Sequence, residues 1–358
     1  MKKLIYIIIA SAIALTACEK TLDFPFEYKQ PKLVLNCVLS NTSEIDFSVS
    51  RSMHILDSKE IVMIPDADVI IFEDDKPLQV VPVSDGQGNY HAAYVPKAGH
   101  TYKFQVSKDG FETIEAEATM VSPTTINSFT GKTKATEAGE YYYSMSEMDF
   151  SLDFSDDQQQ ENYYLITLTT DVPKELKDYL NSYYSQAYYS YDLLDSTYQL
   201  NIECNDISVS SGYDGTSIYL SDEIISGGNY TIKFKANDYR GLYGIFDELQ
   251  YWSELEEDED EDEDDEEDSE DNNDVEDLPF YREFEYSVVV HLRAISKDYY
   301  QYQKSFDLYV ENDGNPFAEP TLVKTNVKNG LGLLAASSEV TDTIKFTIKN
   351  PYLEEEEE

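Results

Sequence analysis

The chain has 358 residues, of which 71 are Asp or Glu and 26 are Lys or Arg, so its formal net charge at pH 7 is −45. This charge excludes binding to nucleic acid or to anionic lipid through a basic patch, because such surfaces repel the chain. Apolar residues make up 41% of the sequence, a share typical of a folded protein.

The first 17 residues have the pattern of a bacterial export signal. Lys2 and Lys3 give a positive start, and a mostly apolar stretch runs from Leu4 to Leu15. A membrane-spanning helix needs about 20 apolar residues, so this shorter stretch predicts a cleaved signal peptide over residues 1–17.

The sequence Leu15-Thr16-Ala17-Cys18 resembles the lipobox of bacterial lipoproteins. The resemblance implies that Cys18 carries a diacylglycerol on its sulfur and becomes the first residue of the mature chain. Residues 18–31 are then a lipid anchor and tether, and each buried acyl CH2 contributes about 0.8 kcal/mol to membrane binding. The alternative is an ordinary secretory signal with a chance cysteine.

Residues 32–122 have the pattern of an antiparallel sandwich. Apolar residues alternate with polar ones in short segments, and turns that contain glycine separate these segments by about ten residues. This order resembles the prealbumin-like or immunoglobulin-like sandwiches of exported bacterial proteins. We expect an N-terminal β-sandwich that ends near Ser122-Pro123. Its segments are Leu33–Leu39, Ile45–Val49, Asp66–Phe72, Tyr90–Tyr94, Tyr102–Val106 and Phe111–Ala116.

Residues 123–350 predict a second, β-rich domain, followed by an acidic tail over 351–358. The period changes once, because Tyr299, Tyr302, Phe306 and Val310 recur every three to four residues. This spacing predicts an amphipathic helix from Asp298 to Asn312, with Ser296 or Asp298 as its N-cap. The fold class is therefore all-β, with two antiparallel sandwiches and one helix. Strands are expected at 126–129, 148–154, 164–168, 200–202, 218–220, 230–234, 286–295 and 341–348.

Two segments interrupt the second domain. Residues 254–277 hold 19 acidic residues and no basic one. Such a segment buries too little apolar area to offset its ordering entropy, so we expect a disordered loop there. The other segment, residues 178–198, holds seven tyrosines.

The sequence predicts neither catalysis nor a metal or cofactor site. The histidines His54, His91, His100 and His291 lie far apart, and no pair has the spacing of metal ligands. Nucleophile elbows, phosphate loops and dinucleotide fingerprints do not occur. Besides Cys18 the chain has Cys37 and Cys204. A disulfide is open to an exported protein, but the apolar surroundings of Cys37 favour a buried thiol.

A set of motifs in the last third of the chain is similar to those of a Bacteroidota lipoprotein family known as domain of unknown function 4249. The resemblance implies a cell-envelope protein without an assigned activity. It also implies a non-catalytic accessory role at a TonB-dependent outer-membrane transporter, with the leaflet left open. The alternative is a surface adhesion protein without a transport role. The motifs are Ser221-Asp222-Glu223, Gly227-Gly228, Ala294–Tyr302, Asn315–Pro320 and Asn326–Gly332, together with the early Leu33–Asn36.

The two C-terminal motifs also have structural interpretations. Phe317 is expected to pin the Asn315–Pro320 loop to the core, and a loop presented to a partner is the alternative. Asn329, Gly330 and Gly332 are expected to supply tight backbone geometry.

The tyrosine-rich segment is the candidate contact for a ligand or partner. Tyrosine offers a rigid apolar face with one polar tip, and such side chains are enriched at interfaces. A merely solvated loop is the alternative. The candidate residues are Tyr183, Tyr184, Tyr188, Tyr189 and Tyr191.

Replacing Tyr183, Tyr184, Tyr188 and Tyr189 with Ser is predicted to weaken partner binding and to leave the melting temperature nearly unchanged. A pull-down and a thermal melt measure the two effects. Binding equal to that of the unaltered chain would exclude this segment as the contact.

Overall fold

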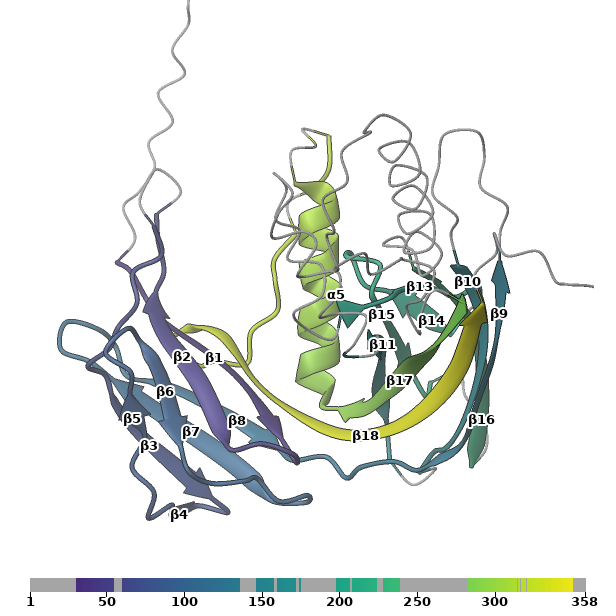
Figure 1. Ribbon diagram of the computed structural model, residues 1–358. Coiled ribbons are helices and arrows are strands. Elements are labelled where there is room, and N and C mark those ends of the chain that lie inside the picture. Colours follow the sequence, from purple (N-terminus) through teal and green to yellow (C-terminus); the bar gives the residue numbers. More distant parts are fainter. Residues whose placement is uncertain are drawn as a thin grey trace, which may run out of the picture.

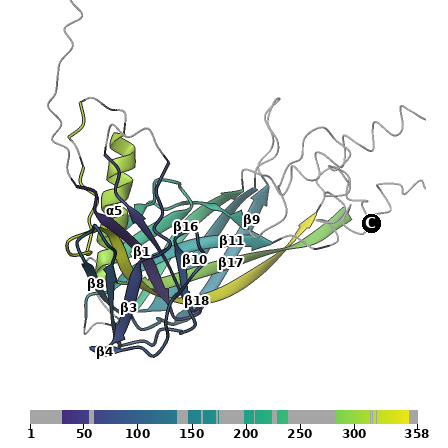
Figure 2. The same ribbon diagram turned by 90° about the vertical axis from the view of Figure 1, so that its left-hand side faces the viewer.

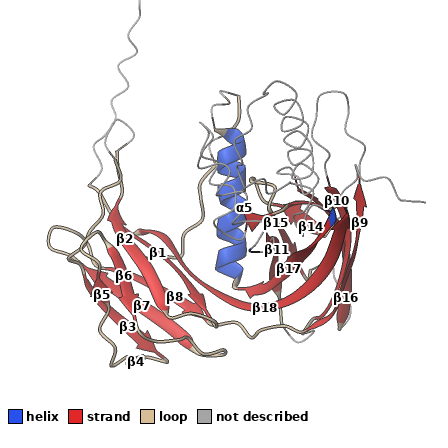
Figure 3. Cartoon of the chain, in the orientation of Figure 1, coloured by secondary structure: helices blue, strands red, loops and turns tan. Residues whose placement is uncertain are grey.

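The computed structural model describes residues 30–54, 60–135, 146–157, 160–171, 174, 198–206, 208–223, 228–238, 282–313, 315, 317–319 and 321–349. These residues form three sheets and the helix α5 (Lys297–Asn312), as Figure 3 shows. The predicted all-β class is confirmed. Residues 1–29, the acidic segment 254–277 and the tail 351–358 lie outside the described residues, so the predictions made for them stay predictions.

The first module packs two sheets face to face (Figure 1). Its core contains the inward side chains of strands that alternate buried and exposed residues, the pattern that the sequence predicts. One layer contains β1 (Leu33–Ser40), β2 (Ile45–Arg51), β6 (Asn89–Ala92) and β5 (Val83–Ser84). The other contains β4 (Lys76–Pro77), β3 (Asp68–Glu73), β7 (Thr101–Ser107) and β8 (Ile114–Thr119).

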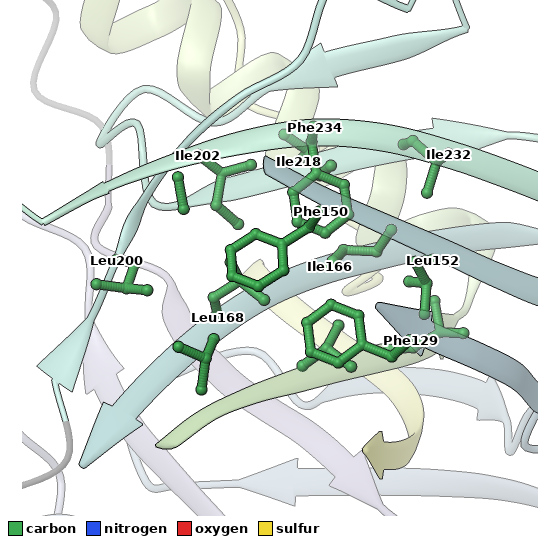
Figure 4. Close-up of a cluster of buried hydrophobic side chains, with 14 of the residues drawn as sticks. Phe129, Phe150, Leu152, Ile166, Leu168, Leu200, Ile202, Ile218, Ile232 and Phe234 are labelled. Atoms are coloured by element: carbon green, nitrogen blue, oxygen red, sulfur yellow. The ribbon is translucent and has the colours of Figure 1, made fainter. Parts of the chain in front are cut away.

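The second module is built the same way, and aromatic and aliphatic side chains fill the space between its layers (Figure 4). One layer contains β14 (Val209–Ser211), β15 (Ser217–Ser221), β11 (Tyr163–Asp171), β17 (Glu283–Ile295) and β18 (Leu331–Lys349), with β12 (Tyr198–Gln199) paired to β11. The other contains β13 (Asn201–Glu203), β16 (Asn229–Asp238), β10 (Ser146–Ser155) and β9 (Ile126–Ala135).

Strand β18 joins the two modules into one structure. Its first part, Leu331–Ser337, pairs in parallel with β1, and its remainder, Ser337–Lys349, pairs antiparallel with β17. The layers that contain β1 and β17 are therefore a single ten-stranded sheet, and Figure 1 shows β18 running from β1 below α5 to the second module.

This connection changes the predicted division of the chain. Val327, Leu334 and Ala336 belong to the core of the first module, although they lie far beyond the predicted boundary at Ser122-Pro123. The residues of 32–122 are thus packed against a strand from the end of the chain. The expected last strand at 341–348 also begins earlier, at Leu331.

Glycines mark the place where β18 enters the first module. Gly332 has a φ of +99°, and a Cβ on this residue would overlap the carbonyl oxygen of Leu35 on β1. Asn329 also adopts a positive φ, of 63°. The tight backbone geometry expected for this motif is confirmed, because β18 approaches β1 too closely for a side chain.

Gly332→Ala is predicted to lower the free energy of unfolding by about 2–4 kcal/mol, because it adds both backbone strain and overlap with β1. Gly86 is the matched control, since its φ is +79° but a Cβ there meets nothing within 4 Å. Gly86→Ala should lower the free energy of unfolding only through backbone strain, by about 1–2 kcal/mol. Urea unfolding followed by circular dichroism measures both values. Equal losses of unfolding free energy in the two variants would contradict the close approach of β18 to β1 at Gly332.

Candidate functional site

The site residues predicted from the sequence lie outside the described residues. This holds for Cys18 and for all five tyrosines from Tyr183 to Tyr191. Cys37 and Cys204, in contrast, are both described and both are free thiols. Cys37 is buried in the first core, and burial raises the pKa of its thiol. The interpretation of Cys37 as a buried thiol is confirmed.

A cleft of about 500 Å³ lies at the junction of the two modules. Its walls come from four parts of the chain: Gly99 before β7, the end of β8 with the following linker (Glu117–Ser122), the segment before β11 (Gln160–Tyr163), and the turn from β17 into α5 (Ala294–Asp298). Sequence reasoning missed this cleft, because no motif links segments so far apart.

Two interactions organise the wall beside α5. Ser296 is the N-cap of the helix, and its hydroxyl accepts from the backbone N–H groups of Tyr299 and Ala336. Lys297 forms an ion pair with Glu161 at 2.7 Å, and its hydrogen bond lowers the pKa of that carboxyl group. The pair is solvent-exposed, so it orients the wall more than it stabilises the fold.

Asn162 donates hydrogen bonds to two carboxylates beside the same cleft. Its side-chain amide donates to Asp156 and Asp222, and its backbone N–H donates to Asp222 at 2.7 Å. Tyr164 donates its hydroxyl to Asp156 at 2.6 Å. Burial and the neighbouring charge of Asp156 raise the pKa of Asp222. These carboxylates are held by local donors, which is the arrangement of a structural cluster.

Helix α5 confirms the predicted segment, with Ser296 as its N-cap. Its first half packs on the sheet through apolar contacts, where Tyr299 and Tyr300 meet a small cluster around Leu165. In the second half the buried residues are polar: Ser305 and Asp307. The apolar stripe of the sequence therefore leaves the core as the helix extends past the sheet (Figure 1).

The buried polar groups of α5 hold two neighbouring segments. Ser305 Oγ accepts from the backbone N–H of Lys324 at 2.8 Å, and Asp307 accepts from that of Tyr213 at 3.3 Å. Burial raises the pKa of Asp307. The helix is thus fixed from both sides by hydrogen bonds.

Apolar side chains are exposed on this fixed helix. Phe306 and Tyr309 are 38% and 48% exposed, and the ring of Phe306 stacks on that of Tyr302 with centroids 6.2 Å apart. We call Tyr302, Phe306 and Tyr309 the aromatic face of α5. Phe317 is 95% exposed, so the expectation that it pins its loop to the core is wrong.

A charged network lies on β17 and β18. Arg293 Nη2 lies 2.6 Å from Glu339 Oε2 and its Nη1 donates to Thr167. His291 Nδ1 lies 3.3 Å from the same carboxylate oxygen, without hydrogen-bond geometry. His291 and Arg293 hold the pKa of Glu339 below its ordinary value. Arg293 and Glu339 are partners in the pairing of β17 with β18, so the ion pair joins the two strands directly.

Within the described residues there is no group of His, Cys, Asp and Glu placed to hold a metal ion, and no helix there has the length and apolarity to cross a bilayer. His91 lies on the surface of the first module between Asp46 and Glu44, and its hydrogen bond to Asp46 raises the pKa of the imidazole.

The fold and these surfaces define a class: an all-β protein whose two sandwiches share one sheet and whose single described long helix exposes aromatic side chains. The profile of a family described as domain of unknown function, DUF4249, matches residues 19–343. The chain therefore belongs to the DUF4249 family, as its motifs predict. A comparison with curated proteins finds no match.

Glu339→Gln is predicted to lower the free energy of unfolding at pH 7 by about 1–2 kcal/mol, because Arg293 loses its counter-charge. The pKa of Glu339 is lowered in the fold, so its stabilisation is present above the ordinary glutamate value and is lost as the pH falls through the lowered one. The variant and the unaltered chain should therefore converge in acid.

Denaturant unfolding between pH 7 and pH 3 measures the difference. Glu161→Gln is the control, since its pair with Lys297 is exposed and its loss should leave the unfolding free energy nearly unchanged. A loss for Glu339→Gln that stays constant down to pH 3 would contradict the assignment.

Proposed function

We propose that this protein is an outer-membrane lipoprotein of a Bacteroidota bacterium, anchored through Cys18, and a non-catalytic accessory of a TonB-dependent transporter. The anchor is supported by the lipobox Leu15-Thr16-Ala17-Cys18. Membership in the DUF4249 family supports the envelope setting through the resemblance that the sequence motifs carry. The family itself assigns no activity, so the role depends on the surface chemistry of the fold.

The aromatic face of α5 is the observation that favours a binding role. Phe306 and Tyr309 are exposed large side chains, and such residues dominate the energetics of protein interfaces. They are also pre-organised, because Ser305 and Asp307 fix the helix through backbone hydrogen bonds. A rigid aromatic surface loses little conformational entropy when a partner binds.

The junction cleft is the second surface that a partner or its cargo could reach. The Lys297–Glu161 pair links two of its walls, and the Ser296 cap fixes the start of α5 beside it. Polar groups of Asn162 and Ser296 line it. This chemistry fits reversible binding of a polar segment better than it fits any covalent step.

The double variant Phe306→Ser/Tyr309→Ser is predicted to reduce transporter capture severalfold without lowering the melting temperature. Mild crosslinking of isolated outer membranes, followed by affinity purification and mass spectrometry, measures the capture. Val81→Ser is the matched control, since Val81 is 79% exposed but lies on the first module.

Two outcomes would contradict the proposal. If the unaltered chain crosslinks to no transporter, the accessory role falls and the adhesion alternative takes its place. If transporter capture is unchanged in the double variant, the partnership stands but the aromatic face is not its contact.

A further inference from the structure

The most exposed large apolar side chains of α5 and the segment after it do not belong to the aromatic face. Phe317 and Leu322 are 95% and 88% exposed, and Leu308 is half exposed. Leu308 lies three residues after Ser305 and four before Asn312, so it shares their side of the helix. We call Leu308, Phe317 and Leu322 the end strip.

The end strip is held in place. Asn312 donates to the hydroxyl of Thr321 at 3.1 Å, which closes the loop that carries Phe317. Within that loop, Asn315 Oδ1 accepts from the backbone N–H of Phe317 at 3.0 Å. Lys324 then donates its backbone N–H to Ser305. These hydrogen bonds hold the backbone on both sides of the end strip, so its exposed side chains are fixed in position.

The strip lies at the end of the molecule where the tether reaches the fold. The chain enters the first module at β1, where Val34 pairs with Leu331. From there Thr325 bonds the carbonyl of Gly332, and its neighbour Lys324 reaches α5. Figure 1 shows the start of β1 and the C-terminal end of α5 at the top, and the rotated view of Figure 2 keeps both there.

The length of the tether limits how far this end lies from the lipid. Residues 19–30 span at most about 43 Å when fully extended. A lipid on Cys18 therefore holds the start of β1 within this distance of the bilayer, and the contacts above connect the end strip to that start.

We propose that the end strip inserts into the headgroup region of the bilayer that carries the Cys18 lipid. Phenylalanine and leucine side chains are the ones that partition into this interface when a structured surface presents them. This inference depends on the lipid attachment that the proposed function also assumes, but not on any transporter.

The negative charge around the end strip determines which lipid headgroups it can contact. Glu311, Asp313 and Glu319 are exposed around it, and the whole chain carries −45. Anionic headgroups repel such a surface, so insertion depends on apolar contact and favours zwitterionic phospholipid. The contact therefore differs from that of a peripheral protein with a basic patch.

The test places a fluorescent side chain in the strip of the native lipidated chain. Trp252 is the single tryptophan of the sequence, so Trp252→Phe gives a dark background. Phe317→Trp in that background reports on the strip, and Val81→Trp reports on an exposed apolar position of the first module. Both are reconstituted on phosphatidylcholine vesicles whose acyl chains are brominated or plain.

The expected result is that brominated chains quench the emission of Phe317→Trp severalfold and leave that of Val81→Trp unchanged. Adding phosphatidylglycerol should reduce the quenching. Emission of Phe317→Trp that stays unquenched while the protein floats with the vesicles would overturn the inference and leave the anchor intact.

Two further outcomes would also overturn the inference. If the chain does not float with the vesicles, the lipid anchor is absent, and the proposed function and this inference fall together. If a photocrosslinker at position 317 in native outer membranes captures a protein and no lipid, the occupant of the strip is a protein and the inference is wrong.

Discussion

The parallel pairing of Leu331–Ser337 with β1 is the interaction on which the rest of the structure depends. It places the end of the chain in the core of the first module and makes one sheet out of two. The junction cleft lies where the two sandwiches meet. The polypeptide after α5 returns along the helix, where Lys324 bonds Ser305, before it reaches β1.

The local alternation of apolar and polar residues predicts most of the strands, but it does not predict the first part of β18. Strands such as β2 and β7 alternate buried and exposed residues, so their period shows directly in the sequence. In β18, by contrast, Leu333–Ser338 is buried on both faces. Small residues such as Ala335 and Ser338 fill those positions because the sheet is covered on both sides, and small polar residues do not give a strand signal.

The candidate surfaces show the same limit of prediction from sequence. The periodicity of α5 predicted its segment correctly but not its exposure, because periodicity cannot tell where the supporting sheet ends. Ser305 and Asp307 are buried since they hold the backbones of Lys324 and Tyr213, and nothing in the sequence marks these partners. The cleft likewise unites four parts of the chain that no motif connects. The predicted contacts at Cys18 and Tyr183–Tyr191 lie outside the described residues and stay predictions.

The late position of β18 has a consequence for biogenesis. Val34 is among the first residues of the fold and its partner Leu331 among the last, so the first sandwich cannot close until almost the whole polypeptide has been synthesised. Pairings of such long sequence separation form slowly, and until then the edge of β1 is open to wrong partners. The net charge of −45 makes unfinished chains repel one another while this edge is open.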